Sequence, residues 1–410
     1  MAIKPKVVNF PNGIKLIMQK TSAINDIAFA IDFPYGSIYE ERKTLGAAHF
    51  NEHMVFKSTP KKKATEIMWD VEREGGLLNA ATTFDRTSID ARAADLEILN
   101  VIYNAFTNFT FDAAEFETER SVIKSELSLR DSNPTYKLSK RFIELLFGEH
   151  PLSLPVGGIV SDIDRLKIAD VIAEKKQFYL PDKLIISVAG NFNEKKLSDG
   201  IKNTFGKIEQ KNFKELILKP VKSKEKFETV TSSEVTTAFI AVGLPSVSVG
   251  HEDEAPLDAL KYLLAGGNSG DFVFSSRLFK NIRHKYGLGY ATGGEHINYK
   301  GVGLFDVGVF GFEPKKVSFV KELIVKEFED LKKKPISVEE FKGLKKSWLA
   351  SRERRREGIS GRANIAANLV FAGLPFNHYD KAIKNLTRER IQECAKRYFN
   401  KFVSVALVPA

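Results

Sequence analysis

Hydrophobic and polar positions along the chain follow two periods in alternation. Short apolar segments at 26–33 and 184–189 have the character of strands, whereas apolar positions within 112–130 recur as on one face of a helix. The segments 77–83 and 87–93 are close enough in sequence to pair as a hairpin. Such a mixture of strands and helices predicts an α+β fold.

Part of this order is repeated in the second half of the chain. The strand pattern at 237–244, followed by Pro245, corresponds to the pattern at 28–33, followed by Pro34, at an offset of 211 residues (245 minus 34). A repeat of this length indicates two homologous domains, each a mixed sheet packed with helices.

The segment between the two halves has a different character. Residues 207–228 are rich in Lys and Glu and have little periodicity, which is typical of a linker. We therefore expect a first domain at 1–206, a linker at 207–228 and a second domain at 229–410.

The composition limits the class of protein. Of the 410 residues, 43% are hydrophobic and 28% are charged, which is the balance of a soluble globular chain and excludes a disordered one. No apolar stretch approaches the roughly 18 residues that a membrane helix needs, so we expect no membrane partner. Because there is no apolar signal core at the N-terminus and Cys394 has no second cysteine to pair with, we expect a cytoplasmic location.

The net charge of +10 arises from 62 basic and 52 acidic residues, which are spread along the chain. A basic balance is compatible with an acidic partner or with solubility alone. Since the basic run at 61–63 is short, we expect no nucleic-acid partner.

One motif points to metal chemistry. His49 and His53 are four positions apart in a segment, 44–56, that has helical spacing, so both side chains project from one face of the predicted helix. Glu52 flanks the same face and can reach a metal-bound water without being a ligand. Two imidazoles suit zinc, and a carboxylate beside the water is what metal-assisted hydrolysis requires.

The simpler alternative is that two surface histidines have this spacing by chance. The two share their face with Leu45 and Phe56, which we expect to turn inward. Polar groups that face a core need partners, so we favour the metal site.

A catalytic zinc usually has a third protein ligand. Glu119 and Glu126 are seven positions apart, two helical turns, and lie on the stripe of Phe116 and Ile123 in the predicted helix at 112–130. A solvated or salt-bridged helix face is the ordinary explanation of such a pair. Next to the two histidines, either glutamate is suited to be the third ligand.

The second half has no counterpart of this motif. Adding the offset of 211 to the positions of His49, Glu52 and His53 gives three leucines: Leu260, Leu263 and Leu264. We therefore expect the second domain to keep the scaffold without a metal site.

Together these residues resemble the pitrilysin and insulin-degrading enzyme family of inverzincin metallopeptidases. The resemblance is to its half-length members, such as the subunits of mitochondrial processing peptidase and their bacterial relatives. It covers essentially the whole chain through five further motifs: Leu77 to Thr82, Glu119 to Glu126, Gly190-Asn191-Phe192, Ser275 to Phe279, and Arg283 to Tyr290.

The resemblance implies a role for each residue of the motif. His49, His53 and Glu126 match the ligands of one Zn²⁺ per chain. Glu52 matches the general base that acts on the zinc-bound water, and Glu119 matches a carboxylate that orients a ligand or tunes its charge.

The resemblance also implies how a substrate is held. Asn79 and Ala80 match a sheet edge along which a peptide adds as an extra strand. In the second domain, Tyr290 matches a donor to the developing oxyanion, and Arg283 matches a group that holds a substrate carbonyl or carboxylate.

The family implies a zinc-dependent endopeptidase that hydrolyses peptides or unfolded segments in a chamber enclosed on dimerisation. Because this chain carries both the zinc set and the Arg/Tyr pair, we expect a homodimer, with a heterodimer with a related subunit as the alternative. A second hypothesis is a non-catalytic or heterodimer-dependent assembly or binding subunit on the same fold.

Overall fold

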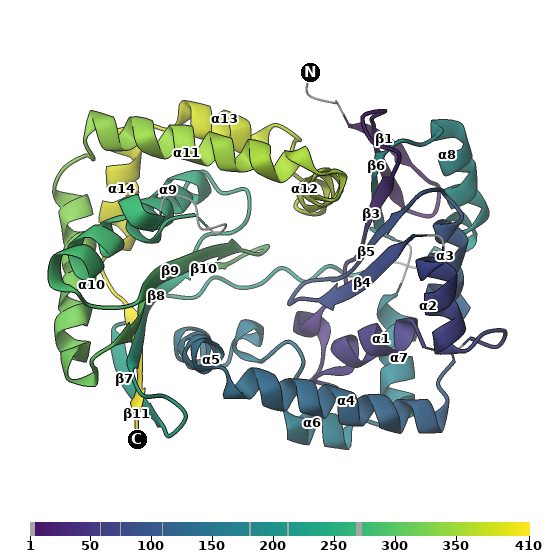
Figure 1. Cartoon of the computed structure of the whole chain (residues 1–410), viewed down its shortest axis with the longest axis horizontal. Coiled ribbons are helices and arrows are strands. Elements are labelled where there is room, and N and C mark those ends of the chain that lie inside the picture. The colour runs from purple at the N-terminus through teal and green to yellow at the C-terminus, as the bar shows by residue number, and fades with distance from the viewer. Residues whose placement is uncertain are drawn as a thin grey trace. The chain divides into compact units, whose positions relative to one another are not determined.

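The computed structural model describes residues 5–57, 59–73, 75–108, 110–179, 182–210, 213–267 and 273–410. The chain divides into two compact units, each built on one β-sheet covered by helices (Figure 1). The first unit comprises Met1–Ser128, Leu154–Leu216 and Arg355–Phe376, and the second comprises Leu129–Ser153, Ile217–Arg354 and Asn377–Ala410. Two sheets packed with helices confirm the predicted fold class.

The first unit has a six-stranded sheet in the order β1-β2-β6-β3-β5-β4, in which only β2 and β6 pair in parallel. Its strands are β1 (Lys6–Asn9), β2 (Lys15–Lys20), β3 (Ile27–Phe33), β4 (Leu77–Thr82), β5 (Thr87–Ala93) and β6 (Ile185–Gly190). Its helices are α1 (Ala47–Val55), α2 (Ala64–Glu72), α3 (Ile98–Asn108), α4 (Ala113–Ser132, of which the last residues fall in the second unit), α6 (Val160–Arg165), α7 (Ile168–Phe178), α8 (Glu194–Asn203) and α12 (Ile359–Phe371).

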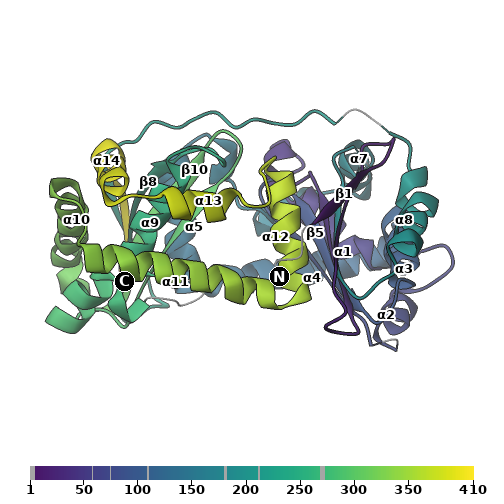
Figure 2. The ribbon, with the colours of Figure 1, turned by 90° about the horizontal axis from the view of Figure 1, so that it is seen from above.

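Both faces of this sheet are covered. All seven residues of β3 are buried, which requires apolar neighbours on either side. Phe29 and Ile31 face the larger core with α1, α3 and α4, whereas Ala28 and Ala30 pack against Ala363 and neighbouring residues of α12. Figure 2 shows α12 on one side of these strands and α2, α3 and α8 on the other. Alanines on both partners let α12 approach the sheet closely.

The second unit has a five-stranded sheet in the order β7-β11-β8-β10-β9, in which only β7 and β11 pair in parallel. Its strands are β7 (Lys226–Ser232), β8 (Ala238–Ser246), β9 (Ala291–Asn298), β10 (Gly303–Phe312) and β11 (Val403–Pro409). Its helices are α5 (Pro134–Phe147), α9 (Glu254–Ala265), α10 (Val317–Lys333), α11 (Val338–Glu357), α13 (His378–Asn385) and α14 (Arg388–Tyr398), with a π-helix at Phe279–His284.

The two units are not the two continuous domains that the sequence predicts on either side of residues 207–228. The helix α5 precedes that segment but packs on β8 and β11 of the second unit, where Phe142 fits against Gly243: a Cβ at Gly243 would lie 2.8 Å from Cζ of Phe142. The helix α12 follows the segment but packs on the first sheet. Each sheet is therefore completed by one helix from the other half of the sequence.

Most local predictions are confirmed. The strands expected at 26–33, 77–83, 87–93 and 237–244 and the helix expected at 112–130 are present with ends shifted by at most two residues. Residues 208–225, as far as the structure describes them, form neither helix nor strand, and β7 begins at Lys226 inside the predicted linker. In the described part of the chain, none of the helices combines the length and the apolar character that crossing a bilayer requires.

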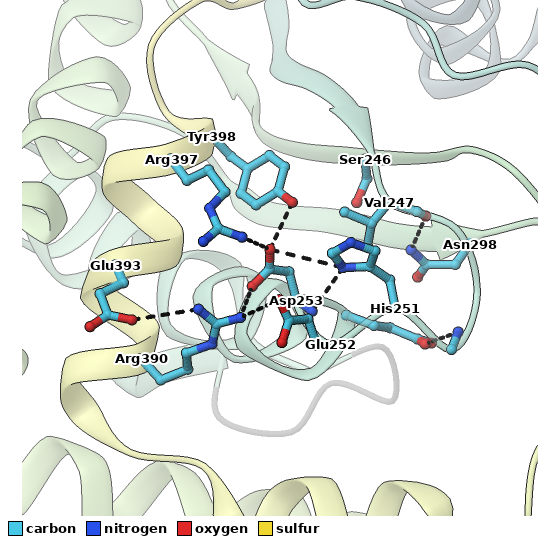
Figure 3. Close-up of polar contacts among 12 residues, drawn as sticks. Ser246, Val247, His251, Glu252, Asp253, Asn298, Arg390, Glu393, Arg397 and Tyr398 are labelled. Carbon is cyan, nitrogen blue, oxygen red and sulfur yellow. Dashed lines mark hydrogen bonds and ion pairs between the residues drawn. The ribbon is translucent and has the colours of Figure 1, made fainter.

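A buried aspartate holds the second unit together at the start of α9. Asp253 is completely buried, and its carboxylate accepts hydrogen bonds from Arg390 (2.6 Å), Arg397 (2.6 Å) and Tyr398 (2.9 Å) of α14 (Figure 3). A buried carboxylate is stable only when such partners replace its hydration. These hydrogen bonds therefore hold α14 against the start of α9.

Replacing Asp253 tests this role. We expect Asp253→Ala to lower the free energy of unfolding by about 2–3 kcal/mol, because charge-assisted hydrogen bonds of this kind are lost and their donors are left behind. The matched control is Glu252→Ala, since Glu252 is exposed and lies 3.4 Å from the same Arg390. Urea unfolding followed by circular dichroism measures both, and equal effects of the two variants would contradict the account.

Candidate metal centre

The helix that carries the histidines has a tightly fixed start. Gly46 precedes α1 with φ of 95°, and a Cβ there would lie 2.7 Å from the side chain of Ile163. The carboxylate of Glu40 accepts hydrogen bonds from the backbone N–H groups of Gly46 (2.9 Å) and Ala48 (2.6 Å). Two of the donors that a helix start leaves open are thereby satisfied immediately before His49.

One side of α1 is anchored in the core while the two histidines lie near the surface. Phe50 and Met54 are fully buried, whereas the side chains of His49 and His53 are 12% and 18% exposed. The two imidazole rings have centroids 4.7 Å apart and stand edge to face. The structure thus brings both histidines together, as their spacing predicts.

A carboxylate from α4 meets both rings. Oε1 of Glu126 lies 3.6 Å from Nε2 of His49, and Oε2 lies 3.2 Å from Nε2 of His53. One ligand atom from each of the three residues can be chosen so that all lie within 4.8 Å of one another. Glu126 is half exposed, so this side of the group is open to solvent.

These three side chains fit a zinc ion. Tetrahedral ligand atoms about 2.0–2.2 Å from zinc lie roughly 3.3–3.6 Å from each other, and the two distances between Glu126 and the histidines, 3.6 and 3.2 Å, are close to this range. Two imidazoles and one carboxylate are also a donor set typical of catalytic zinc, which leaves one coordination position for water.

Glu119 occupies a different place from Glu126. Its Oε2 lies 3.1 Å from Nδ1 of His53, on the side of the ring away from Glu126, and its Oε1 lies 2.7 Å from Nζ of Lys57. Glu119 is also the more buried of the two glutamates, with 8% of its side chain exposed. Of the two glutamates that the sequence offers as a third ligand, Glu126 is the one whose oxygens face the Nε2 atoms of both histidines. Glu119 faces Nδ1 of His53 instead.

Glu52 has a buried oxygen beside this group. Its Oε2 has no hydrogen-bond partner among the described residues. Burial raises the pKa of Glu52 above its ordinary value, while hydrogen bonding with Thr82 and the nearby His53 act in the opposite direction. A carboxylate with one unsatisfied oxygen and a raised pKa is suited to accept a proton from a water molecule.

The strand β4 runs past Glu52 at the edge of the first sheet. It pairs with β5, and it ends the strand order of that sheet, so its other edge is not paired within the described sheet. Asn79 is exposed on this strand and Ala80 is half-buried. Both predicted substrate-contact residues therefore lie on an edge to which a further strand can add.

A cavity of about 510 Å³ opens at the first half of β4. Its walls are apolar at Phe29, Met68 and Leu78, and its charged residues are of both signs: Glu72, Asp90 and Arg92.

Arg283 and Tyr290 lie together in the second unit. The guanidinium carbon of Arg283, on the π-helix, is 5.4 Å from the centre of the Tyr290 ring, and Tyr290 is 78% exposed. Leu260, Leu263 and Leu264 are fully buried in α9, which carries core residues where α1 carries the motif. The predicted roles of Arg283 and Tyr290 toward the first unit stay predictions.

Two neighbours of the site were not found from the sequence. Thr82 is the last residue of β4 and interacts with Glu52, and Lys57 follows α1 and contacts Glu119. Lys57 comes four residues after His53, which is the only signal in the sequence that could have drawn attention to it.

Comparison with known proteins identifies the family. Residues 15–158 match the family described as insulinase (peptidase family M16), and residues 165–347 match the peptidase M16 inactive domain. The chain belongs to the M16 peptidase family. This M16 member is therefore related to the proteins that its motifs resemble.

Relatives of this M16 member carry similar names. The uncharacterized zinc protease YmxG of Bacillus subtilis is 26% identical over 404 residues, which are 97% of this chain and 96% of that protein. The uncharacterized zinc protease Rv2782c of Mycobacterium tuberculosis is 28% identical over 299 residues, which are 71% of this chain and 66% of that protein.

Solved structures have the same fold. A protease from Helicobacter pylori superposes with a TM-score of 0.91 and 25% identity, covering 99% of both chains. A peptidase M16 inactive domain from Pseudomonas fluorescens superposes with a TM-score of 0.89 and 16% identity, covering 99% of this chain and 98% of that one.

Proposed function

We propose that this M16 member is a zinc-dependent endopeptidase that hydrolyses peptides or unfolded segments. The observation that carries the proposal is the convergence of His49, His53 and Glu126. Glu52 interacts electrostatically with His53 and Glu126, and its buried Oε2 has no hydrogen-bond partner among the described residues. Metal ligands and a proton acceptor are the parts that hydrolysis of an amide requires.

The chemistry divides between the metal and the chain. His49, His53 and Glu126 would hold the zinc ion, which would act as a Lewis acid and lower the pKa of a water molecule. Glu52 accepts the proton of the attacking water and later donates it to the amine that leaves. Glu119 accepts the Nδ1–H of His53, which fixes the tautomer that leaves Nε2 free to bind metal.

The sheet edge supports a peptide as the substrate. An extended segment can form backbone hydrogen bonds with β4 next to Asn79 and Ala80 whatever its sequence. The cavity at the start of β4 then receives one side chain and contributes to specificity. Backbone recognition of this kind favours unfolded segments, because a folded protein has few free strands to offer.

We further propose that two copies of the chain, in the cytoplasm, enclose the substrate in a chamber, so that Arg283 and Tyr290 complete the site of the partner. The exposure of Tyr290 and its contact with Arg283 support a surface that is ready to meet another group. Tyr290 would donate to the developing oxyanion, and Arg283 would hold a carbonyl or carboxylate of the substrate.

The alternative is a non-catalytic or heterodimer-dependent subunit. The second half is similar to a domain described as inactive, and its three leucines stand where the first half has His49, Glu52 and His53. The presence of all candidate zinc residues in the first half favours the enzyme over this alternative.

A substitution at Glu52 separates the proposed base from metal binding. We expect Glu52→Gln to retain zinc while kcat/KM for a fluorogenic peptide falls by about 10²–10⁴-fold, the usual contribution of a general acid–base group. The matched control is Glu117→Gln, since Glu117 is an exposed glutamate paired with Arg120 on α4. Full turnover by zinc-loaded Glu52→Gln would exclude Glu52 as the base.

Mixing two inactive variants tests whether sites are shared between chains. Glu52→Gln and Tyr290→Phe each disable one half of a site, and we expect Tyr290→Phe alone to lose about 10²–10³-fold in kcat. If a homodimer shares its sites, randomly exchanged mixtures recover about a quarter of wild-type activity, because half of the dimers have one intact site out of two. Each variant exchanged with itself is the control, and no recovery after verified exchange would contradict shared sites.

A further inference from the structure

Lys57 lies just beyond the helix that carries both histidines. Its backbone N–H donates to the carbonyl of Met54 (3.1 Å), which continues the turn of α1 and fixes where the side chain begins. The ammonium group reaches Oε1 of Glu119 at 2.7 Å. Lys57 is partly exposed, whereas the carboxylate that it contacts is buried.

Glu119 connects Lys57 to a metal-facing ring. Its other oxygen, Oε2, lies 3.1 Å from Nδ1 of His53, whose Nε2 in turn lies 3.2 Å from Glu126. The order of contacts is therefore Lys57, Glu119, His53 and then the point where the zinc ligands converge. The two oxygens of Glu119 therefore contact two different partners, His53 and Lys57.

We propose that Lys57 is a positioning residue of the zinc centre, acting through Glu119 on His53; this inference rests on the proposed function. A carboxylate held by one hydrogen bond can turn about its last torsion, whereas charge-assisted bonds to both oxygens fix its plane. Lys57 thus holds Glu119 in the orientation that receives the Nδ1–H of His53. The imidazole is then held with Nε2 directed at the metal before the metal arrives.

The burial of Glu119 distinguishes this ion pair from the pair that Lys124 forms with Asp164 in the same unit. Lys124 and Asp164 also lie 2.7 Å apart, but their side chains are 38% and 47% exposed, and exposed pairs contribute little. The side chain of Glu119 is 8% exposed. Loss of the Lys57 side chain therefore leaves the buried carboxylate of Glu119 with its contact to His53 alone. We expect this change to weaken metal binding through His53.

The test measures zinc affinity, which does not depend on turnover. We expect Lys57→Met to bind zinc about tenfold more weakly than wild type in competition with a chromophoric chelator, the lower end of the effect of removing outer partners of metal ligands. We expect Lys57→Arg to restore most of this loss because it keeps the charge. Lys124→Met is the matched control and should bind zinc like wild type.

A double-mutant cycle shows whether Lys57 acts through Glu119. We expect Glu119→Gln to weaken zinc binding at least as much as Lys57→Met, and the double variant to bind no more weakly than Glu119→Gln alone, since the two residues form one chain of contacts. Thermal unfolding of each metal-free variant checks that it is folded, and Lys57→Gln provides a second variant if Lys57→Met is not.

The possible failures are distinct. Wild-type affinity in folded Lys57→Met or Lys57→Gln, or full additivity with Glu119→Gln, would overturn the role of Lys57 while leaving the proposed function in place. Wild-type protein that fails to bind stoichiometric zinc would overturn the proposed function itself, and this inference with it.

Discussion

The candidate site depends on contacts between polar side chains of α1 and α4, which face each other and satisfy each other's charges and hydrogen-bonding groups. On α1, a spacing of four places His49 and His53 on one side, and on α4, a spacing of seven places Glu119 and Glu126 on one side. Each histidine therefore contacts a carboxylate, and Glu119, the more buried of the two carboxylates, also contacts the ammonium group of Lys57. Imidazoles and carboxylates in such a setting need either these partners or a cation, which is why the same contacts that stabilise the helices also prepare a metal site.

The second unit meets a similar requirement without a metal. Its helix α9 carries buried leucines at the corresponding positions, and the charge at its start, Asp253, is compensated by Arg390 and Arg397. The polar cluster there binds one helix to another, whereas the cluster on α1 leaves a half-exposed carboxylate and an unsatisfied oxygen. The two units therefore compensate their buried polar groups in different ways.

The sequence was sufficient where the relevant information is local. Strand and helix periods predicted β3, β4, β5, β8 and α4, and the spacing of His49 and His53 predicted their shared face. Spacing could not distinguish Glu119 from Glu126, because both lie on one stripe of α4 and only the crossing with α1 decides which oxygen faces which ring nitrogen. Lys57 was missed for the same reason, since its role comes from a contact 62 positions away in the sequence (119 minus 57). The packing of α5 and α12 on the sheet of the other half could not be predicted either. An amphipathic pattern shows that one face of a helix is buried, but not which sheet it packs against.

We expect peptide hydrolysis by this protein to depend on zinc held by His49, His53 and Glu126. The most direct measurement is cleavage of a quenched fluorescent peptide library by purified protein, before and after removal of metal with a chelator and again after zinc is returned, with His53→Ala in parallel. We expect the chelator to abolish cleavage by the wild type and added zinc to restore it, with no restoration in His53→Ala. Cleavage that persists without metal, or none from a wild-type protein that holds stoichiometric zinc, would contradict it.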